Sequence, residues 1–430
     1  MIPGRTRRGF LRDVAASIAV AAGAGGAFAC APRARDGRAE VTLWFSYGGT
    51  NRQVLLSLVK RFNEEQGRVR VLPTYQGDYF EGLAKLRTAL AAKAGPTLTH
   101  VVGEVVPYLA EAAVLEHLDR FEGASTLDLV PELAQARGFV GGDLRPLVAL
   151  PFNRSTPIVY YDARLFADLG LAPPSTWDEL RTTAGRLTVR GAGGEVSRWG
   201  FECPIDWWFW VALVGQAGGK LLDGDGPPLL GGDAGVRALE FWQTLIHTDR
   251  TMKPPPGRDY NAWQATNTDF LSRRVPMIWT STAFLRYLEQ NASFQVAAAP
   301  LPIQVRASVP TGGTMFVMPK GSPAELQVAG FAFLRWMMLP KQANEWATRT
   351  GYMPVSSAGR RELETSGYYA AHPNDHVAVA QLQHAEPWPW SPELFRVQRE
   401  AVQPRLEEAV LTRRDARATL EEARRAAVDP

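Results

Sequence analysis

Short apolar segments alternate with longer helix-like segments at the start of the chain, and this alternation limits the fold more than any other feature. Val41–Phe45, Val69–Tyr75 and Leu98–Val102 are apolar runs typical of buried strands. The segments between them carry apolar residues at helical spacing; Thr50 is expected to cap the first helix, and the second is expected to span about 79–94. Strand–helix–strand at this spacing predicts parallel strands joined by right-handed crossovers, and therefore an α/β fold.

The ends of these strands are the first candidate binding positions. Open α/β sheets bind ligands at the carboxyl ends of their strands. In this chain those ends are Ser46–Gly49, Gln76–Tyr79 and Gly103–Glu104.

The chain is too long for one ordinary compact domain, since it has 430 residues. Leu147–Tyr161 contains two strand-like runs separated by a polar segment between prolines, which suits an extended connection between two bodies. Phe294–Pro302 has the features of a second crossing of this kind. Two α/β lobes joined by several crossings are expected.

The first 29 residues have the features of an export signal. Thr6–Arg12 is basic and contains paired arginines, and the apolar run from Val14 to Phe28 has 15 residues. A membrane-spanning helix needs roughly 20 residues, so a signal segment is expected here and not a span. The paired arginines resemble a twin-arginine signal. The sequence ending at Cys30 resembles a lipobox, although Ala27 replaces the usual leucine. Residues 30–39 would then be a tether after lipidation of Cys30.

The distribution of charge and cysteine excludes some classes of partner. The formal net charge is +3, and all of it lies in residues 1–29, so the rest of the chain has as many acidic as basic side chains. A nucleic-acid-binding protein normally has a basic surface, so no nucleic-acid partner is expected. The two cysteines are Cys30 and Cys203. If Cys30 carries lipid, Cys203 has no disulfide partner and is expected to be a small buried residue.

Sequence motifs of enzymes are missing. The chain has no G-x-S-x-G elbow, no H-E-x-x-H motif and no dinucleotide fingerprint after a strand. Gly215–Leu222 is only partly similar to a phosphate-binding loop, because the spacing of its glycines is short and no Ser or Thr follows Lys220. His372 and His376 have a metal-ligand spacing, but Pro373 between them favours a capped turn. We therefore expect no catalytic residue, no cofactor and no metal.

Six segments carry a resemblance to a known family over nearly the whole chain after the signal. Together with the expected export and the two lobes, they resemble the solute-binding proteins of ABC importers, in the branch that binds glycerol-3-phosphate and glycerophosphodiesters. The segments are RFNEEQG, VLPTYQGDY, LPFNRSTPIVYYD, STWDEL, PTGGTMFVMPKG and RTGYMPVS.

The resemblance implies a type II periplasmic-binding-protein-like fold with a ligand cleft between the lobes. Lobe 1 would comprise residues 40–153 and about 300–353. Lobe 2 would comprise residues 154–299 and about 354–430. The protein would be a monomer that meets the membrane only through its lipid anchor and delivers its ligand to a permease pair with an ATPase.

By motif, Tyr79 and Glu104 stand where family members hold the glycerol group. A carboxylate accepts hydrogen bonds from two hydroxyls, and a phenol both accepts and donates. Each residue has a structural alternative, Tyr79 as an aromatic residue at a helix start and Glu104 as an acidic residue near a helix N-terminus.

The same motifs place the donors for a phosphate on Ser155, Ser281, Gly313 and Tyr352. Glycine is suitable there because a residue without Cβ lets its N–H approach an anion. The arginine of the family falls on Arg399, whose guanidinium would donate hydrogen bonds to a phosphate.

The position of this arginine is open. Arg396, three residues earlier, is the rival, and a solvated helix face is the alternative for Arg399. Arg154 lies beside Ser155 in the sequence and could contribute, although the motif does not require it.

The aromatic stretch Trp207–Trp210 is expected to be mostly core. The ligand-facing tryptophan of the family falls on Trp208, and a second aromatic residue of some members is Ile205 here. Adjacent helical residues point ~100° apart, so the four aromatic residues cannot all face a ligand. A shift of alignment would instead select Trp207 and Trp210.

Two other functions compete with capture of a phosphoglycerol. The same architecture could bind a neutral sugar or oligosaccharide. A lipid-anchored hydrolase is the alternative from another class.

Overall fold

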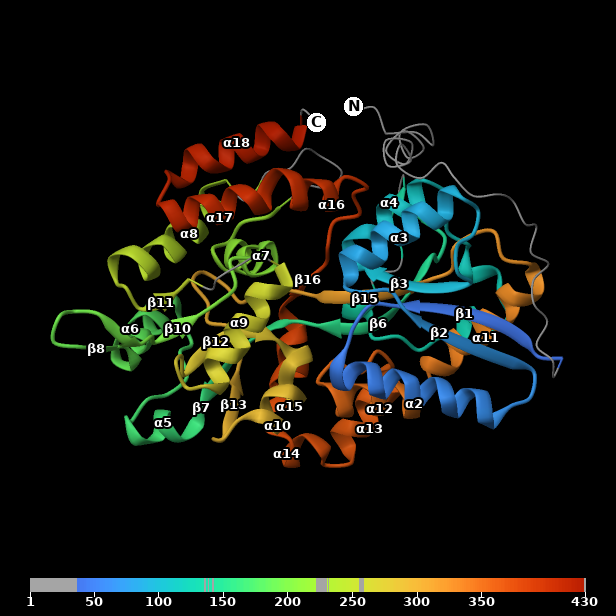
Figure 1. Ribbon diagram of the computed structural model, residues 1–430, viewed down its shortest axis with the longest axis horizontal. Helices are drawn as coiled ribbons and strands as arrows, with labels where there is room; N and C mark the ends of the chain where they lie inside the picture. The colour runs from blue at the N-terminus through green and yellow to red at the C-terminus, as the bar shows by residue number, and fades with distance from the viewer. Residues whose placement is uncertain are drawn as a thin grey trace, which may run out of the picture.

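The computed structural model describes residues 37–428 except 135–136, 138, 141–142, 222–229, 231 and 255–258. The expected signal segment and Cys30 lie outside the described residues. Two five-stranded sheets, each flanked by helices, form the two lobes of a mixed α/β protein (Figure 1).

The sheet of lobe 1 has the strand order β2-β1-β3-β15-β6. As expected from the sequence, β1 pairs in parallel with β2 and with β3. β15 is antiparallel to both β3 and β6, so β6 runs in the same direction as β3. The carboxyl ends of β1, β2, β3 and β6 therefore share one edge of the sheet with the start of β15. The bounds are β1 Ala39–Phe45, β2 Val69–Tyr75, β3 Leu98–Val102, β6 Ala149–Ser155 and β15 Gly312–Val317.

The helices of lobe 1 pack on this sheet or, as α12 and α13 do, on a neighbouring helix. The stripe expected for α2 is confirmed, because its buried residues are Val54, Leu55, Leu58, Val59 and Phe62. The expectation that Thr50 caps this helix was wrong, since α2 begins at Gly49 and its N-cap is Gly48, which makes no side-chain hydrogen bond. The helices are α2 Gly49–Glu65, α3 Tyr79–Ala91, α4 Val106–Glu111, α11 Ala324–Met337, α12 Pro340–Thr350 and α13 Ser357–Thr365.

The sheet of lobe 2 has the strand order β11-β10-β12-β7-β13. β10 is parallel to β11 and β12, whereas β7 is antiparallel to β12 and β13. The carboxyl end of β12 therefore lies beside the start of β7, where the chain enters lobe 2. The bounds are β7 Pro157–Asp162, β10 Phe201–Glu202, β11 Met252–Lys253, β12 Met277–Ser281 and β13 Val296–Ala299.

The C-terminal helices α17 and α18 pack on lobe 2 beside α8 (Figure 1). The remaining elements are two-stranded pairs and short helices at the edges of the lobes and between them. The helices of lobe 2 are α5 Ala163–Asp168, α6 Trp177–Leu187, α7 Trp207–Gln216, α8 Gly232–Gln243, α9 Asp259–Leu271, α10 Leu285–Asn291, α17 Gln403–Thr412 and α18 Ala416–Val428. The other elements are β4 Phe139–Val140, β5 Asp143–Leu144, β8 Val189–Arg190, β9 Val196–Arg198, β14 Val309–Pro310, β16 Ala385–Glu386, α14 Tyr368–Ala371, α15 Pro373–Ala380 and α16 Leu394–Arg396.

A single residue, Thr156, separates β6 of lobe 1 from β7 of lobe 2. Its backbone oxygen accepts from the backbone N–H of Thr282 at 3.1 Å, and its hydroxyl oxygen accepts from Nε2 of Gln381 at 2.6 Å. The chain returns to lobe 1 between β13 and β15. The exact boundaries of the lobes remain our proposal, because the segment 357–384 packs against both α12 and β13.

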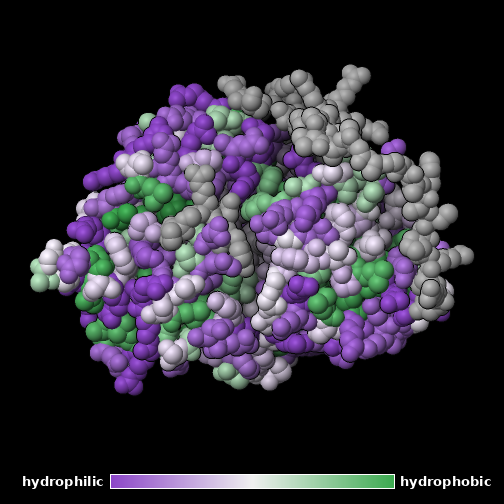
Figure 2. All heavy atoms as spheres, in the orientation of Figure 1, coloured by the Kyte–Doolittle hydropathy of each residue, from purple (hydrophilic) through white to green (hydrophobic). Residues whose placement is uncertain are grey.

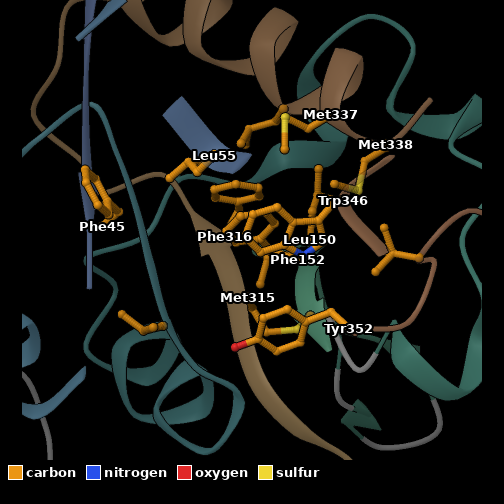
Figure 3. Packing of buried hydrophobic residues seen from close by; sticks show 14 of the residues in the cluster. Phe45, Leu55, Leu150, Phe152, Met315, Phe316, Met337, Met338, Trp346 and Tyr352 are labelled. Atoms are coloured by element: carbon orange, nitrogen blue, oxygen red, sulfur yellow. The ribbon is translucent and has the colours of Figure 1, made fainter. Parts of the chain in front are cut away.

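Aromatic rings fill the core of lobe 1 on one face of its sheet. Phe152 stacks on Phe316 with ring centroids 4.0 Å apart and on Trp346 at 4.7 Å. Tyr352 stacks in turn on Trp346 at 5.6 Å. Figure 3 shows Tyr352 at the border of this cluster, with its hydroxyl turned away from the apolar side chains. The core therefore holds the ring of a candidate site residue and leaves its hydroxyl to polar partners.

Candidate functional site

The last residues of β6 are the centre around which the candidate site is built. Asn153, Arg154 and Ser155 reach the edge where β1, β2 and β3 also end. In the ladder with β15, Arg154 lies opposite Gly313 and Ser155 opposite Gly312. The backbone oxygen of Arg154 accepts from Met353 N at 2.9 Å, which brings the loop after α12 to the same edge.

Two phenols and an amide form one end of the site. Nδ2 of Asn153 donates to Oη of Tyr79 at 2.9 Å and to Oη of Tyr352 at 3.2 Å. The two phenol oxygens are 3.3 Å apart. Tyr79 is the first residue of α3, whose start is fixed by a capping box of Asp78 and Glu81. The structure thus brings together two expected site residues through Asn153, which sequence reasoning missed.

Glu104 lies in a short 3-10 turn after β3 and is 8% exposed. Burial raises the pKa of its carboxyl to about 7. A hydrogen bond to its own backbone and the positive charge of Arg154 lower this pKa, and the negative charge of Asp206 raises it. Asp206 is the N-cap of α7 in lobe 2, so charges from both lobes act on this carboxyl.

Arg154 is fully buried, and the sequence motif gave no requirement for it. Its Nη2 donates to Oγ1 of Thr311 at 2.8 Å, and its Nη1 donates to the backbone oxygen of Gly313 at 3.3 Å. Burial lowers its pKa to about 10, and Glu104 opposes this shift. The arginine therefore stays charged at neutral pH and supplies the buried positive charge near Glu104.

The expected serines lie where the two lobes join. Ser281 is the last residue of β12 and lies opposite Pro157, the first residue of β7. Its hydroxyl accepts from Ala283 N at 3.2 Å and so caps the following turn. Ser155 is two residues before Pro157, on the lobe 1 side of Thr156. Both hydroxyls therefore belong to the same junction.

Gly313 needs to be glycine for two reasons. Its φ is +86°, a conformation that other residues adopt at a cost. A Cβ atom there would lie 1.8 Å from the backbone oxygen of Asn153. Its neighbour Gly312 has another constraint, because a Cβ atom would lie 2.6 Å from Cζ2 of Trp208.

The aromatic stretch is largely core. Trp207, Phe209 and Trp210 are at most 1% exposed, and Trp208 is 8% exposed. Trp208 lies against Gly312 of β15, whereas Trp207 stacks on Trp388 with ring centroids 6.3 Å apart. Trp208 is thus the member of the stretch that contacts the strand beside Ser155.

The structure separates the two candidate arginines. Arg396 donates from Nη2 to the backbone oxygen of Ala427 at 2.7 Å and pairs with Glu393, so it holds the end of α18. Arg399 lies in a π-helical turn, Val397–Val402, and its guanidinium carbon is 4.1 Å from the ring centroid of Phe80. π-Helical turns occur frequently at functional sites. Arg399 therefore reaches from lobe 2 to the residue that follows Tyr79.

Several other expectations concern the chain as a whole. Cys203 is buried with a free thiol, as expected. In the described part of the chain, no helix combines the length and apolar character needed to cross a membrane. The same residues contain no cluster of three or more His, Cys, Asp or Glu side chains suited to a metal. Hydrophilic residues cover most of the face seen in Figure 2, with smaller apolar patches between them.

Two α/β lobes, with polar side chains gathered at the facing sheet edges, define a two-domain protein of the periplasmic-binding-protein type. The chain belongs to the bacterial extracellular solute-binding proteins, whose family model matches residues 57–364. It is accordingly a solute-binding protein of an ABC importer, of an extracellular or periplasmic class, and it is not an enzyme.

Similar proteins include the sn-glycerol-3-phosphate-binding periplasmic protein UgpB of Yersinia pestis bv. Antiqua, which is 25% identical over 374 residues covering 82% of each chain. UgpB of Escherichia coli O1:K1 is 26% identical over 371 residues, again 82% of each chain. Among solved structures, UgpB from Mycobacterium tuberculosis in complex with glycerophosphocholine has a TM-score of 0.77 and 23% identity, covering 90% of this chain and 97% of that one. The cyclic alpha-maltosyl-1,6-maltose binding protein from Arthrobacter globiformis has a TM-score of 0.72 and 22% identity, covering 91% and 98%.

Proposed function

We propose that this protein captures glycerol-3-phosphate or a glycerophosphodiester, such as glycerophosphocholine, between its lobes and delivers it to a permease pair powered by an ATPase. The observation that carries the proposal is the grouping of Tyr79, Tyr352 and Glu104 at the same sheet edge as Ser155 and Gly313. Hydroxyl-binding groups and anion donors thus lie along one edge of the sheet.

The glycerol group would be held by lobe 1. Tyr79 and Tyr352 present two phenols 3.3 Å apart, and the Glu104 carboxyl lies at the end of the neighbouring strand β3. A carboxylate can accept from two hydroxyls of one glycerol. Tyr352, which the motif assigned to the phosphate, belongs by its contacts with Tyr79 to this hydroxyl end in our proposal.

The phosphate would be held where the lobes join. Ser155 and Ser281 offer hydroxyls, Gly313 offers a backbone N–H without a shielding Cβ, and Arg399 offers a guanidinium from lobe 2. The positively charged Arg154, whose Nη1 donates to the backbone oxygen of Gly313, adds to the favourable potential for an anion. Trp208 would line one side of the site. The relatives named for sn-glycerol-3-phosphate support this ligand class.

A neutral oligosaccharide is the second candidate ligand, because some similar structures are named for such ligands. They include the Arthrobacter protein and maltose-bound MalE3 of Thermotoga maritima, with a TM-score of 0.76 and 19% identity over 90% of this chain and 98% of that one. A neutral ligand would use the phenols and carboxyl of lobe 1 and would gain little from Arg399.

Titration calorimetry of the purified protein with glycerol-3-phosphate, glycerophosphocholine and maltose tests the proposal. We expect saturable heat with at least one phosphate ester and none with maltose. Binding of maltose with no response to either ester would refute the phosphoglycerol proposal and favour the oligosaccharide. The ratio of the two ester affinities then decides between monoester and diester.

The export and anchoring of the protein are also proposals. We propose that residues 1–29 act as a twin-arginine signal and that Cys30 is lipidated, so that a monomer is tethered through residues 30–39 to the outer face of the membrane. Mass spectrometry of the protein extracted from membranes checks this proposal. An unmodified Cys30, or an unchanged membrane fraction after Cys30→Ser, would exclude the anchor.

A further inference from the structure

A buried chain of hydrogen bonds crosses the sheet of lobe 1 and ends at the two phenols. It starts at Ser46, which follows β1, and continues through His100 in the middle of β3. The backbone N–H of Ser46 lies 3.0 Å from Nε2 of His100, and Nδ1 of His100 lies 2.7 Å from Oγ1 of Thr314 in β15. His100 and Thr99 are the two polar residues of β3, whose other residues are apolar.

The direction of the first two bonds is fixed. A backbone N–H can only donate, so Nε2 of His100 must accept and carries no proton. The ring lies among aromatic side chains, and burial lowers its pKa to about 3, so the imidazole is neutral at physiological pH. Its one proton is therefore on Nδ1, which donates to Oγ1 of Thr314.

The same donor-to-acceptor direction continues through Asn153. Oγ1 of Thr314, having accepted from His100, donates its own proton to Oδ1 of Asn153. The backbone N–H of Thr314 also donates to Oδ1, at 2.7 Å, which fixes the orientation of the amide. Nδ2 of Asn153 must therefore face Tyr79 and Tyr352, and it donates to both phenol oxygens.

We infer that this ordered chain leaves at least one O–H of the Tyr79–Tyr352 pair to donate toward the ligand, and that His100, Thr314 and Asn153 are positioning residues for specificity. Each phenol oxygen accepts from the amide, so its own O–H is directed to an acceptor elsewhere. At most one of the two O–H groups can donate its hydrogen bond to the oxygen of the other phenol. The pair thus selects a ligand oxygen that accepts, such as a free hydroxyl.

This inference rests on the proposed function, and the test separates the two. The probes are glycerol-3-phosphate and propyl phosphate, which keeps the phosphate and lacks both hydroxyls. We expect the wild-type protein to prefer glycerol-3-phosphate strongly. Thr314→Val removes the link between His100 and Asn153 and should reduce the ratio of the two affinities about tenfold, the effect of one or two hydrogen bonds. Thr314→Ser should recover the ratio.

A purely structural role for the chain would lower the melting temperature of Thr314→Val and leave the ratio unchanged, and that result overturns the inference. A ¹⁵N NMR spectrum of the wild-type protein showing His100 protonated at Nε2 overturns it as well. Should Thr314→Val not fold, Tyr352→Phe removes only a terminal hydroxyl and should reduce the ratio similarly. If the wild-type protein binds neither ester, the proposed function is wrong and this inference falls with it.

Discussion

The two ends of the proposed site are built in different ways. The hydroxyl end lies within lobe 1, where Asn153 joins Tyr79 and Tyr352 through bonds made by the protein alone. The phosphate end draws on both lobes, with Ser155 from β6, Ser281 from β12 and Arg399 from the C-terminal tail. One end is ordered by its own sheet, and the other depends on how the lobes meet.

This difference suggests a division of roles. A preorganised end loses little entropy on binding and discriminates among ligands by the direction of its hydrogen bonds. An end assembled from two lobes can couple binding of the phosphate to the approach of the lobes.

Arg399→Ala tests the assembled end. Removing the charge partner of a desolvated phosphate should weaken binding of a phosphate ester on the order of 2–5 kcal/mol. Calorimetry should show this loss with glycerol-3-phosphate. The matched control is Arg424→Ala on α18, an exposed arginine paired with Glu421 at 3.1 Å. Equal affinities for the Arg399 and Arg424 variants would show that Arg399 does not bind the phosphate.

Gly313→Ala tests the strand that the two ends share. Its positive φ and the close approach of the Asn153 oxygen should lower the free energy of unfolding by about 2–4 kcal/mol. Chemical denaturation measures this loss. Gly321→Ala is the control, because Gly321 has a φ of +117° but open space around it, so it reports backbone strain alone. If Gly313→Ala lowers the free energy of unfolding no more than Gly321→Ala does, the chain relieves the contact between the new Cβ and the Asn153 oxygen at little cost.

Glu104 tests the preorganised end through pH. Because its pKa in the folded protein is raised to about 7, the folded state holds the proton more tightly than the unfolded state, whose value is near 4.5. This contribution to stability is complete below pH 4.5 and is lost as pH rises to about 7. The full loss amounts to about 3 kcal/mol.

Glu104→Gln should remove that part of the pH dependence, as measured by denaturation at several pH values. The comparison with this variant is necessary because Glu202, whose pKa burial also raises to about 7, titrates in the same window. Binding of a diol to the Glu104 carboxylate should also release a proton near pH 6, visible as a dependence of the calorimetric heat on the buffer. Identical pH profiles of wild type and Glu104→Gln would contradict this account.

Trp208→Phe tests the side of the proposed site that Trp208 would line, and it should have the smallest effect on binding. Partial loss of a contacting indole should weaken ligand binding by about 1 kcal/mol with little change in stability. Trp210→Phe, at a fully buried position, should lower stability and leave affinity nearly unchanged. The opposite pattern for the two variants would place Trp210, and not Trp208, at the ligand.

The sequence predicted the parts of the molecule that depend on local patterns. The strands Val69–Tyr75 and Leu98–Val102 have the predicted bounds, because apolar runs between turn residues specify them locally. The choice between Arg396 and Arg399 could not be made in this way. The two lie three residues apart on one helical segment, and they are distinguished by the packing of α18 against Arg396.

The hydrogen-bond partners inside the site were also out of reach. Asn153 and Thr314 are 161 positions apart in the chain, and His100 and Thr314 are 214 apart. Their pairing follows from the strand order of the sheet, in which β15 lies between β3 and β6. Sequence reasoning did not single out His100, and its partner depends on a strand that enters the sheet much later.

The one-residue connection at Thr156 has a mechanical consequence. In any rotation of one lobe against the other near this point, an atom moves in proportion to its distance from the axis. Ser155 and Ser281, beside the connection, would be displaced little. Arg399 is carried by lobe 2, and its guanidinium lies over the ring of Phe80 in lobe 1, so the same rotation would change this contact. A small change of angle at Thr156 would therefore alter the contact between Arg399 and Phe80 more than the spacing of Ser155 and Ser281.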